Sequence, residues 1–207
     1  MPTPRIARPA LAAALLAIAG CSMLEMSPSS PRDPAARAPK PGTAATPPAG
    51  APAAAGGTSL SLSNASGTAG QRVDVSVTLH TGGTRIAGTQ SDLVFDPSQI
   101  AVLPKANGKP DCTANSALGK DGTAFSFLPK GCKPMIGAGC TTVRALVLSL
   151  SNVDPIADGA RLFSCKVQIG PQARPGAQTM TMTRVGFSDP KGGEIQGGGR
   201  NGAVTVK

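Results

Sequence analysis

The most regular feature of this chain is the alternation of apolar and polar residues along several short segments. The clearest is 72–80, RVDVSVTLH, in which every second residue is Val or Leu. A period of two is typical of a β-strand with one buried face and one solvated face. The pattern therefore predicts a strand whose inward side chains are Val73, Val75, Val77 and Leu79.

Similar signals recur along the rest of the chain, and Gly, Pro, Asn and Asp separate them. No segment has the apolar spacing of a helix. About nine short strands with turns between them predict an all-β domain, a single β-sandwich. The predicted strands are 59–64, 72–80, 86–97, 100–103, 123–129, 142–153, 161–170, 179–189 and 203–207.

The alternation also predicts which side chains face the core. Gln90, Asp92 and Asp96 are expected to face outward. The segment 142–153, TVRALVLSLSNV, is apolar at nearly every position, which predicts a central strand. Its second face is then either covered, for example by the long polar loop 104–122, or exposed as a contact surface. The expected inward residues of the other strands are Leu60, Leu62, Leu93, Phe95, Phe125, Phe127, Phe163, Cys165, Val167 and Ile169.

The first 57 residues have a different character. Arg5 and Arg8 precede an apolar run at 10–19, which is too short for the ~20 residues that span a bilayer. A basic start followed by a short apolar run predicts a secretory signal peptide. Residues 22–57 are rich in Pro, Ala, Gly and Ser and predict a disordered linker. Residues 58–207 are long enough for one folded domain.

The apolar run closes on Ile18-Ala19-Gly20-Cys21, which resembles the bacterial lipobox. That resemblance implies a signal peptide at 1–20, a lipidated Cys21 and a linker that continues to residue 57. The alternative is an ordinary signal peptide with a chance cysteine. Ser22, rather than Asp, favours the outer membrane. We therefore expect a lipid-anchored protein of the bacterial outer membrane or cell surface, with the domain in the periplasm or outside the cell.

Charge and cysteine content narrow the function classes. The domain at 58–207 holds 15 Lys and Arg against 9 Asp and Glu, scattered and without interleaved aromatic residues. A nucleic-acid site would need a basic patch or stripe, so no nucleic-acid partner is expected. Four cysteines in an oxidising compartment predict two disulfides, and three pairings are possible. The Pro and Gly residues of CKPMIGAGC favour a chain reversal that joins Cys132 to Cys140. The absence of a CxxC spacing argues against a zinc site.

Candidate catalytic and ligand-binding residues are few. His80 is the single histidine and follows a strand as a turn residue, so no enzyme activity and no cofactor are expected. Asn152, Asp154 and Asp158 offer oxygen ligands for calcium, although these residue types are also common in turns. The chain has no Trp or Tyr, and its Phe residues mostly fall on predicted core faces. Sugar binding on an aromatic platform is therefore disfavoured, while binding in a polar groove stays open.

The order AGQRVDVSVTL, IAGTQSDLVFDPSQI and DGARLFSCKVQIG, followed by a terminal strand, resembles the cohesin domain of bacterial cellulosomes. Gly70, Val73, Val75 and Val77 match the opening strand of that family. The segment 95–97, Phe-Asp-Pro, matches the end of its third strand. The resemblance covers nearly all of 58–207. It implies a nine-stranded jelly-roll sandwich, a fold also found in some carbohydrate-binding modules.

The resemblance also implies a protein-binding role. Cohesins usually carry Asn and Asp on the outer face of the third strand, where dockerin docks, and Gly88 and Gln90 stand at those positions here. The expected binding face contains Gln90, Asp92 and Arg144. Its partner is expected to be a dockerin-like or other envelope protein. The alternatives are a polysaccharide ligand or a purely structural envelope domain.

A cohesin-like topology further implies the second disulfide. It places 161–170 beside the strand at 100–104, and Cys112 follows that strand and folds back toward Cys165. The expected pairs are therefore Cys112–Cys165 and Cys132–Cys140. The alternative pairs are Cys112–Cys132 and Cys140–Cys165.

Overall fold

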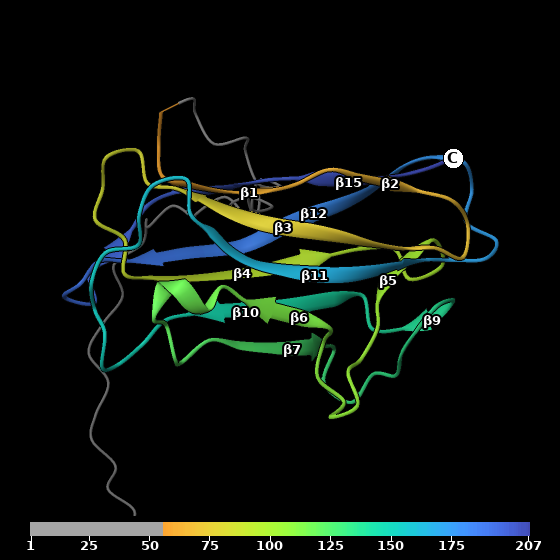
Figure 1. Cartoon of the computed structure of the whole chain (residues 1–207), viewed down its shortest axis with the longest axis horizontal. Helices are drawn as coiled ribbons and strands as arrows, with labels where there is room; N and C mark the ends of the chain where they lie inside the picture. Colours follow the sequence, from red (N-terminus) through yellow and green to blue (C-terminus); the bar gives the residue numbers. More distant parts are fainter. Residues whose placement is uncertain (1–55) are drawn as a thin grey trace, which may run out of the picture. The chain divides into compact units, whose positions relative to one another are not determined.

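The computed structural model describes residues 56–207, which form strands and loops with one 3-10 turn at Ser116–Leu118 (Figure 1). Within this range no helix is long and apolar enough to cross a membrane. The predicted signal peptide, Cys21 and most of the predicted linker lie outside the described residues. The strands are β1 (Ser59–Leu62), β2 (Ala65–Gly67), β3 (Arg72–His80), β4 (Gly88–Val94), β5 (Ile100–Val102), β6 (Cys112–Ala114), β7 (Ala124–Leu128), β8 (Pro134–Met135), β9 (Ala138–Gly139), β10 (Thr142–Val147), β11 (Arg161–Ile169), β12 (Gly176–Ser188), β13 (Glu194–Ile195), β14 (Gly198–Arg200) and β15 (Gly202–Val206).

The strands form two sheets that pack face to face. The first sheet has the order β14-β1-β3-β11-β5, and β6 also pairs with β11. The second sheet has the order β2-β15-β12-β4-β10-β7, and β13 also pairs with β12. A separate two-stranded hairpin joins β8 to β9. The chain is therefore a β-sandwich, as the alternation predicts.

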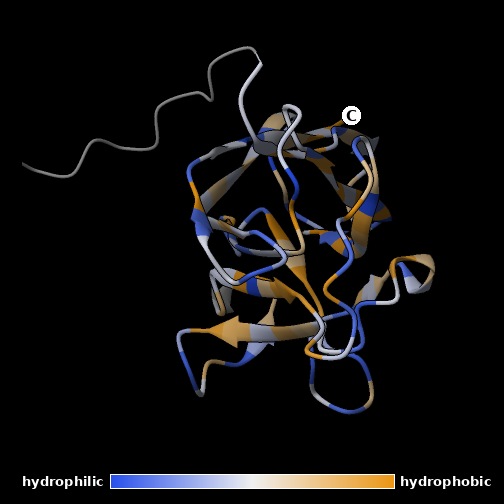
Figure 2. Ribbon diagram, turned by 90° about the vertical axis from the view of Figure 1, so that its left-hand side faces the viewer, coloured by the Kyte–Doolittle hydropathy of each residue, from blue (hydrophilic) through white to orange (hydrophobic). Residues whose placement is uncertain are grey.

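The core lies between the two sheets and is filled by the inward side chains of both. Val77 and Val167 come from the first sheet, and Leu93 and Val143 come from the second; all four are completely buried. In Figure 2 the central strands carry most of the hydrophobic residues, and the connecting loops carry many of the hydrophilic ones. Burial of this apolar surface is the main favourable term in folding. The predicted inward residues Phe125 and Phe127 are only partly buried, because β7 is an edge strand.

All nine predicted strands are present, and they correspond to β1, β3, β4, β5, β7, β10, β11, β12 and β15. Six further strands of two or three residues were not predicted from the sequence. One of them, β2, lies in the predicted turn ASGTAGQ and pairs in parallel with β15. Another, β6, lies in the predicted loop 104–122 and pairs with β11. Such short strands give too few residues for alternation to be read.

The strand predicted at 142–153 is shorter than expected. Strand β10 ends at Val147, opposite Thr89 near the start of β4. Beyond it the Ser149 hydroxyl accepts hydrogen bonds from the backbone N–H groups of Ser151 and Asn152, which turns the chain away from the sheet. This Ser-centred turn competes with strand pairing, as hydroxyl side chains do in loops.

Both disulfides join the expected cysteines. Cys112 and Cys165 are direct neighbours on the paired strands β6 and β11, so the bond ties the 104–122 segment to the first sheet. Cys132 and Cys140 close the short reversal that contains β8 and β9. The expected neighbourhood of 161–170 and 100–104 is also present, as the β11–β5 pair.

Candidate binding face on the second sheet

The outward side of β7, β10, β4 and β12 forms a continuous surface, which we call the outer face. The strand registers arrange its residues in rows that cross all four strands. Most of these side chains are small, apolar or uncharged. The rows are Leu128, Thr142, Val94 and Thr181; Ser126, Arg144, Asp92 and Thr183; Ala124, Leu146, Gln90 and Gly186; and, at the end of β4 and β12, Gly88 and Ser188.

An ion pair between β4 and β10 lies at the centre of the outer face. Arg144 donates from Nε to Asp92 Oδ1 at 2.7 Å and from Nη2 to Oδ2 at 2.8 Å. This two-pronged geometry is the strong form of an Arg–carboxylate contact. The hydrogen bond to Asp92 raises the pKa of Arg144 above its ordinary value, so the guanidinium stays charged.

Asp92 faces outward as predicted, but its predicted availability as a surface residue of the binding face is wrong. Its backbone position points outward, as the alternation requires, but only 4% of the residue is accessible to solvent. The Arg144 side chain, which is 34% exposed, lies across the carboxylate. Of the three predicted face residues, Gln90 and Arg144 are therefore available to a partner, whereas Asp92 acts from beneath the surface.

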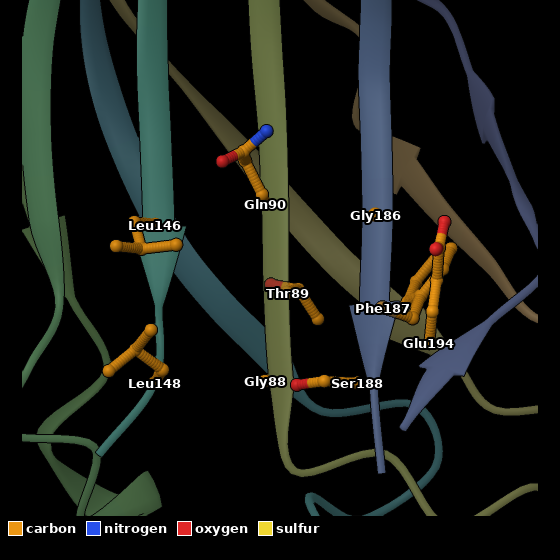
Figure 3. Close-up of a pocket in the computed structure, with 9 residues that line it drawn as sticks. All are labelled: Gly88, Thr89, Gln90, Leu146, Leu148, Gly186, Phe187, Ser188 and Glu194. Atoms are coloured by element: carbon orange, nitrogen blue, oxygen red, sulfur yellow. The ribbon is translucent and has the colours of Figure 1, made fainter. Parts of the chain in front are cut away.

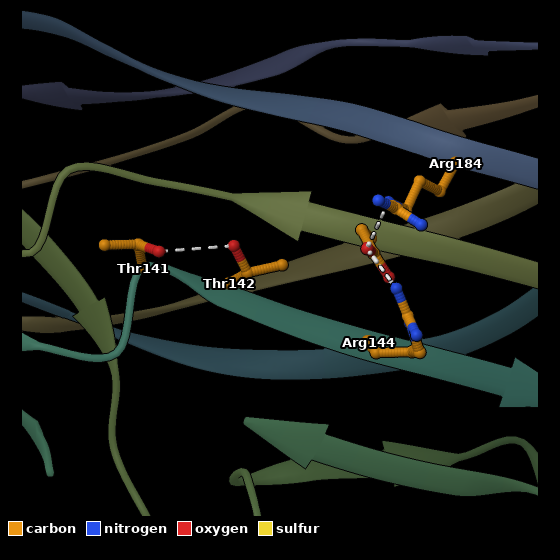
Figure 4. Close-up of polar contacts among 5 residues, drawn as sticks. Thr141, Thr142, Arg144 and Arg184 are labelled. Carbon is orange, nitrogen blue, oxygen red and sulfur yellow. Dashed lines mark hydrogen bonds and ion pairs between the residues drawn. The ribbon is translucent and has the colours of Figure 1, made fainter. Parts of the chain in front are cut away.

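A second arginine, Arg184, reaches the same carboxylate from β12 (Figure 4). Its Nε lies 3.8 Å from Asp92 Oδ2. The register of β12 against β4 shifts between Thr183 and Gly186, so Arg184 sits in a β-bulge. Its φ of 48° makes it the one non-glycine residue with positive φ among those described. Bulges commonly redirect a side chain in this way.

A groove of about 240 Å³ runs along the end of the outer face (Figure 3). Leu146 and Leu148 form one side of it, and Phe187 and Glu194 form the other. A side chain added at Gly186 would meet no atom within 4 Å, which shows that the surface above this glycine is open. The groove is thus shallow and partly apolar.

The predicted loop 104–122 does not cover the outer face. Its middle part pairs with β11 in the first sheet, and its end lies beside Leu148 and bonds to residues 151–154 of the loop after β10. Leu150 is 93% exposed and Val153 is 50% exposed, next to the groove. Exposed apolar side chains that cluster beside a groove are typical of an interaction surface.

Several oxygen atoms of the possible calcium ligands already accept hydrogen bonds from protein groups. The Asp158 carboxylate accepts hydrogen bonds from the backbone N–H and hydroxyl of Thr81, which hold its pKa below the ordinary value. The backbone carbonyls of Asn152 and Asp154 instead accept hydrogen bonds from Lys120 Nζ, both at 2.8 Å. Within residues 56–207 no three acidic, His or Cys side chains are grouped as metal ligands.

The single histidine lies beside a serine on the surface. His80 Nε2 lies 2.8 Å from Ser61 Oγ on the exposed side of β1 and β3. Asp158 is hydrogen-bonded to Thr81, and no hydrogen bond joins it to His80 among the described residues. Among residues 56–207 no hydrogen bond joins His80 to a third group of the kind that orients the imidazole of a catalytic triad.

No known family profile matches the chain, and no curated protein matches it. Solved structures do match. The sixth cohesin of scaffoldin B from Acetivibrio cellulolyticus, in complex with a dockerin, is 17% identical, and the match covers 73% of this chain and 99% of that one, with a TM-score of 0.56. The cohesin of a type I cohesin–dockerin complex from Clostridium thermocellum is 13% identical, with 73% and 99% covered and a TM-score of 0.57.

A non-cellulosomal cohesin from the archaeon Archaeoglobus fulgidus is 12% identical, with 73% and 91% covered and a TM-score of 0.53. These matches span nearly all of each cohesin. The described domain has the cohesin fold. The identities are low, so the likeness concerns the fold of this cohesin-like domain and its two-sheet architecture.

Sequence reasoning located Gln90 and Arg144 but missed Arg184 and Glu194. Arg184 follows the alternating stretch TMTMT, and the bulge that brings it to Asp92 leaves no mark in the alternation before it. Glu194 enters the groove through β13, a strand of only two residues. Both contributions depend on how distant strands pair.

Proposed function

We propose that this chain is a non-catalytic envelope lipoprotein whose cohesin-like domain binds a dockerin-like protein partner. The partner contacts the outer face of β7, β10, β4 and β12. The observation that carries this proposal is the composition of that face, whose outward residues are small, apolar or uncharged outside one ion cluster. The solved cohesins with dockerins bound show that this fold supports protein recognition.

The anchoring part of the proposal rests on the sequence. The Ile18-Ala19-Gly20-Cys21 motif supports lipidation of Cys21, and the Pro- and Ala-rich residues after it suit a tether. Fatty-acid labelling of the producing cells tests this part separately. The label is expected on the unmodified chain and lost from the Cys21→Ala variant. A label that survives this substitution contradicts lipidation at Cys21.

The binding part can be tested by photo-crosslinking in the cells that produce the chain. A photoreactive benzoyl-phenylalanine is placed at Gln90 or Ser126 on the outer face, or at Asp74 or Lys166 on the exposed side of the first sheet. The proposal predicts one protease-sensitive adduct of constant mass from the first two positions and none from the other two. Adducts from Asp74 and Lys166 alone would place the binding surface on the first sheet.

A polysaccharide ligand would give a different result in the same experiment. Its adduct would resist proteases and disappear on treatment with glycosidases. None of the five Phe residues of the described domain is fully exposed: Phe95, Phe163 and Phe187 are buried, and Phe125 and Phe127 are partly buried and packed against the core, so no flat aromatic platform for sugars is presented. This is why a protein partner is the stronger proposal.

A further inference from the structure

The centre of the outer face carries one surplus positive charge, whereas the carboxylate of Glu194, on β13, lies at the groove end. Among the outward residues of β7, β10, β4 and β12, only Arg144 and Asp92 are charged, and Arg184 joins them from the bulge. The cluster thus combines two guanidinium groups with one carboxylate. A partner that covers the face must either neutralise the surplus charge or leave it without solvent, which is costly.

Arg184 is the group available for such a contact. Asp92 is buried and already receives both hydrogen bonds of Arg144. The Arg184 side chain is 73% exposed, and its Nε is too far from Asp92 Oδ2, at 3.8 Å, for a hydrogen bond. Its guanidinium donors therefore face solvent, although the attraction of Asp92 keeps the group above the middle of the face.

The backbone sets the direction in which the Arg184 side chain leaves β12. Its left-handed φ of 48° belongs to the bulge between Thr183 and Gly186. Residues other than glycine adopt this conformation at an energetic cost, and such outliers occur often at functional sites. A side chain that already starts toward the middle of the face has fewer conformations to lose when the partner arrives.

The surroundings indicate what kind of anion fits. The neighbouring outward residues are hydroxyl-bearing, such as Ser126 and Thr183, or apolar, such as Val94 and Leu146. A polyanion would require a series of cations along its length, and the outer face supplies a single surplus charge. A planar carboxylate matches the forked geometry of a guanidinium group.

We propose that the Arg184–Asp92–Arg144 cluster receives an aspartate or glutamate carboxylate of the protein partner. Arg184 makes the direct contact, and Asp92 and Arg144 position it. This inference rests on the proposed binding function and assigns the charge of the partner at the centre of the interface.

The test uses the full chain with the photoreactive residue at Gln90, in the producing cells, and measures the adduct yield. Reversal of the charge with Arg184→Glu is expected to lower the yield at least ~10-fold, since a mismatched charge pair at an interface is strongly unfavourable. Arg184→Gln is expected to lower it less. Arg200→Glu makes the same charge change on β14 of the first sheet and should leave the yield unchanged.

The crosslinked partner peptide is then mapped by mass spectrometry. An Asp or Glu close to the crosslink, when changed to Lys, is expected to restore the yield with Arg184→Glu. If Arg184→Glu and Arg184→Gln both crosslink as well as the unmodified chain, the carboxylate contact is wrong, although the binding face stands. If the unmodified chain gives no adduct from Gln90, the proposed function itself fails. Equal melting temperatures of the variants show that a loss is not due to unfolding.

Discussion

The exposed sides of the two sheets differ although their inner sides are equally apolar. On the first sheet β3 and β11 expose a polar residue at each outward position, with Asp74 directly opposite Lys166 and Arg72 bonded to Gln168. On the second sheet the outward positions of β4 and β10 include Gly88, Val94 and Leu146. Packing of the core does not depend on the outward residues of either sheet. The exposed side of the first sheet is that of a solvated surface, whereas the outer face of the second sheet suits a partner.

Removal of each disulfide should give the largest difference in free energy of unfolding between variants. The Cys112–Cys165 bond, within the first sheet, spans 53 residues, and the Cys132–Cys140 bond spans 8. On a loop-entropy estimate the first contributes about 4 kcal/mol and the second about 2.5 kcal/mol. We therefore expect the Cys112→Ala, Cys165→Ala double variant to lose more free energy of unfolding than the Cys132→Ala, Cys140→Ala double variant. Denaturant unfolding measures both.

An equal loss in the two double variants would contradict this account of the first sheet. The closed β8–β9 hairpin would then contribute as much to the free energy of unfolding as the bond between β6 and β11.

The aspartates of the two exposed sides should differ in their effect on stability. Asp92→Ala leaves the Arg144 guanidinium without its carboxylate at a site that is 34% exposed, so we expect a loss of about 2 kcal/mol, less than for a fully buried pair. Asp74→Ala removes an exposed charge and should cost below about 0.5 kcal/mol. Chemical denaturation of both variants checks the difference. Comparable losses would mean that the central ion pair does not hold β4 to β10.

A smaller contribution to stability, from the Asp158 carboxylate, should depend on pH. The hydrogen bonds from Thr81 lower the pKa of Asp158 in the folded state. A lowered pKa means that the ionised carboxylate stabilises the fold above about pH 4, the value in an unfolded chain, and that this contribution is lost as pH falls through the folded pKa. Asp158→Asn should therefore lower the melting temperature at neutral pH and have no effect in strong acid. A difference that persists in strong acid would contradict this cause.

The sandwich is predictable from the sequence because its long strands have one buried face. In 72–80 each inward position is Val or Leu, so the period of two specifies both the strand and its orientation. The same alternation correctly predicts that Asp92 faces outward. It could not predict that Asp92 is buried, because the covering groups, Arg144 and Arg184, come from two other strands.

The end of β10 shows a second limit of such patterns. Leu148 and Leu150 continue the apolar run beyond Val147, so the sequence predicts a longer strand. The chain instead turns at Ser149, and the ammonium group of Lys120 binds the carbonyls of Asn152 and Asp154 in the loop that follows. Lys120 lies 32 residues before Asn152, so the sequence around the loop does not indicate this contact.

The central claim is that the outer face of the second sheet binds the partner, and a matched pair of valine substitutions tests it most directly. Gly186→Val adds a side chain at the groove, where its Cβ would meet no atom within 4 Å, and Ser76→Val adds apolar bulk on the outward side of β3. Both are compatible with a strand, so both variants should keep the melting temperature of the unmodified chain. Titration calorimetry with the partner identified by crosslinking is expected to show at least ~10-fold weaker binding for Gly186→Val, from lost complementarity at the interface, and unchanged binding for Ser76→Val. Unchanged binding by Gly186→Val together with weakened binding by Ser76→Val would contradict the account and move the site to the first sheet.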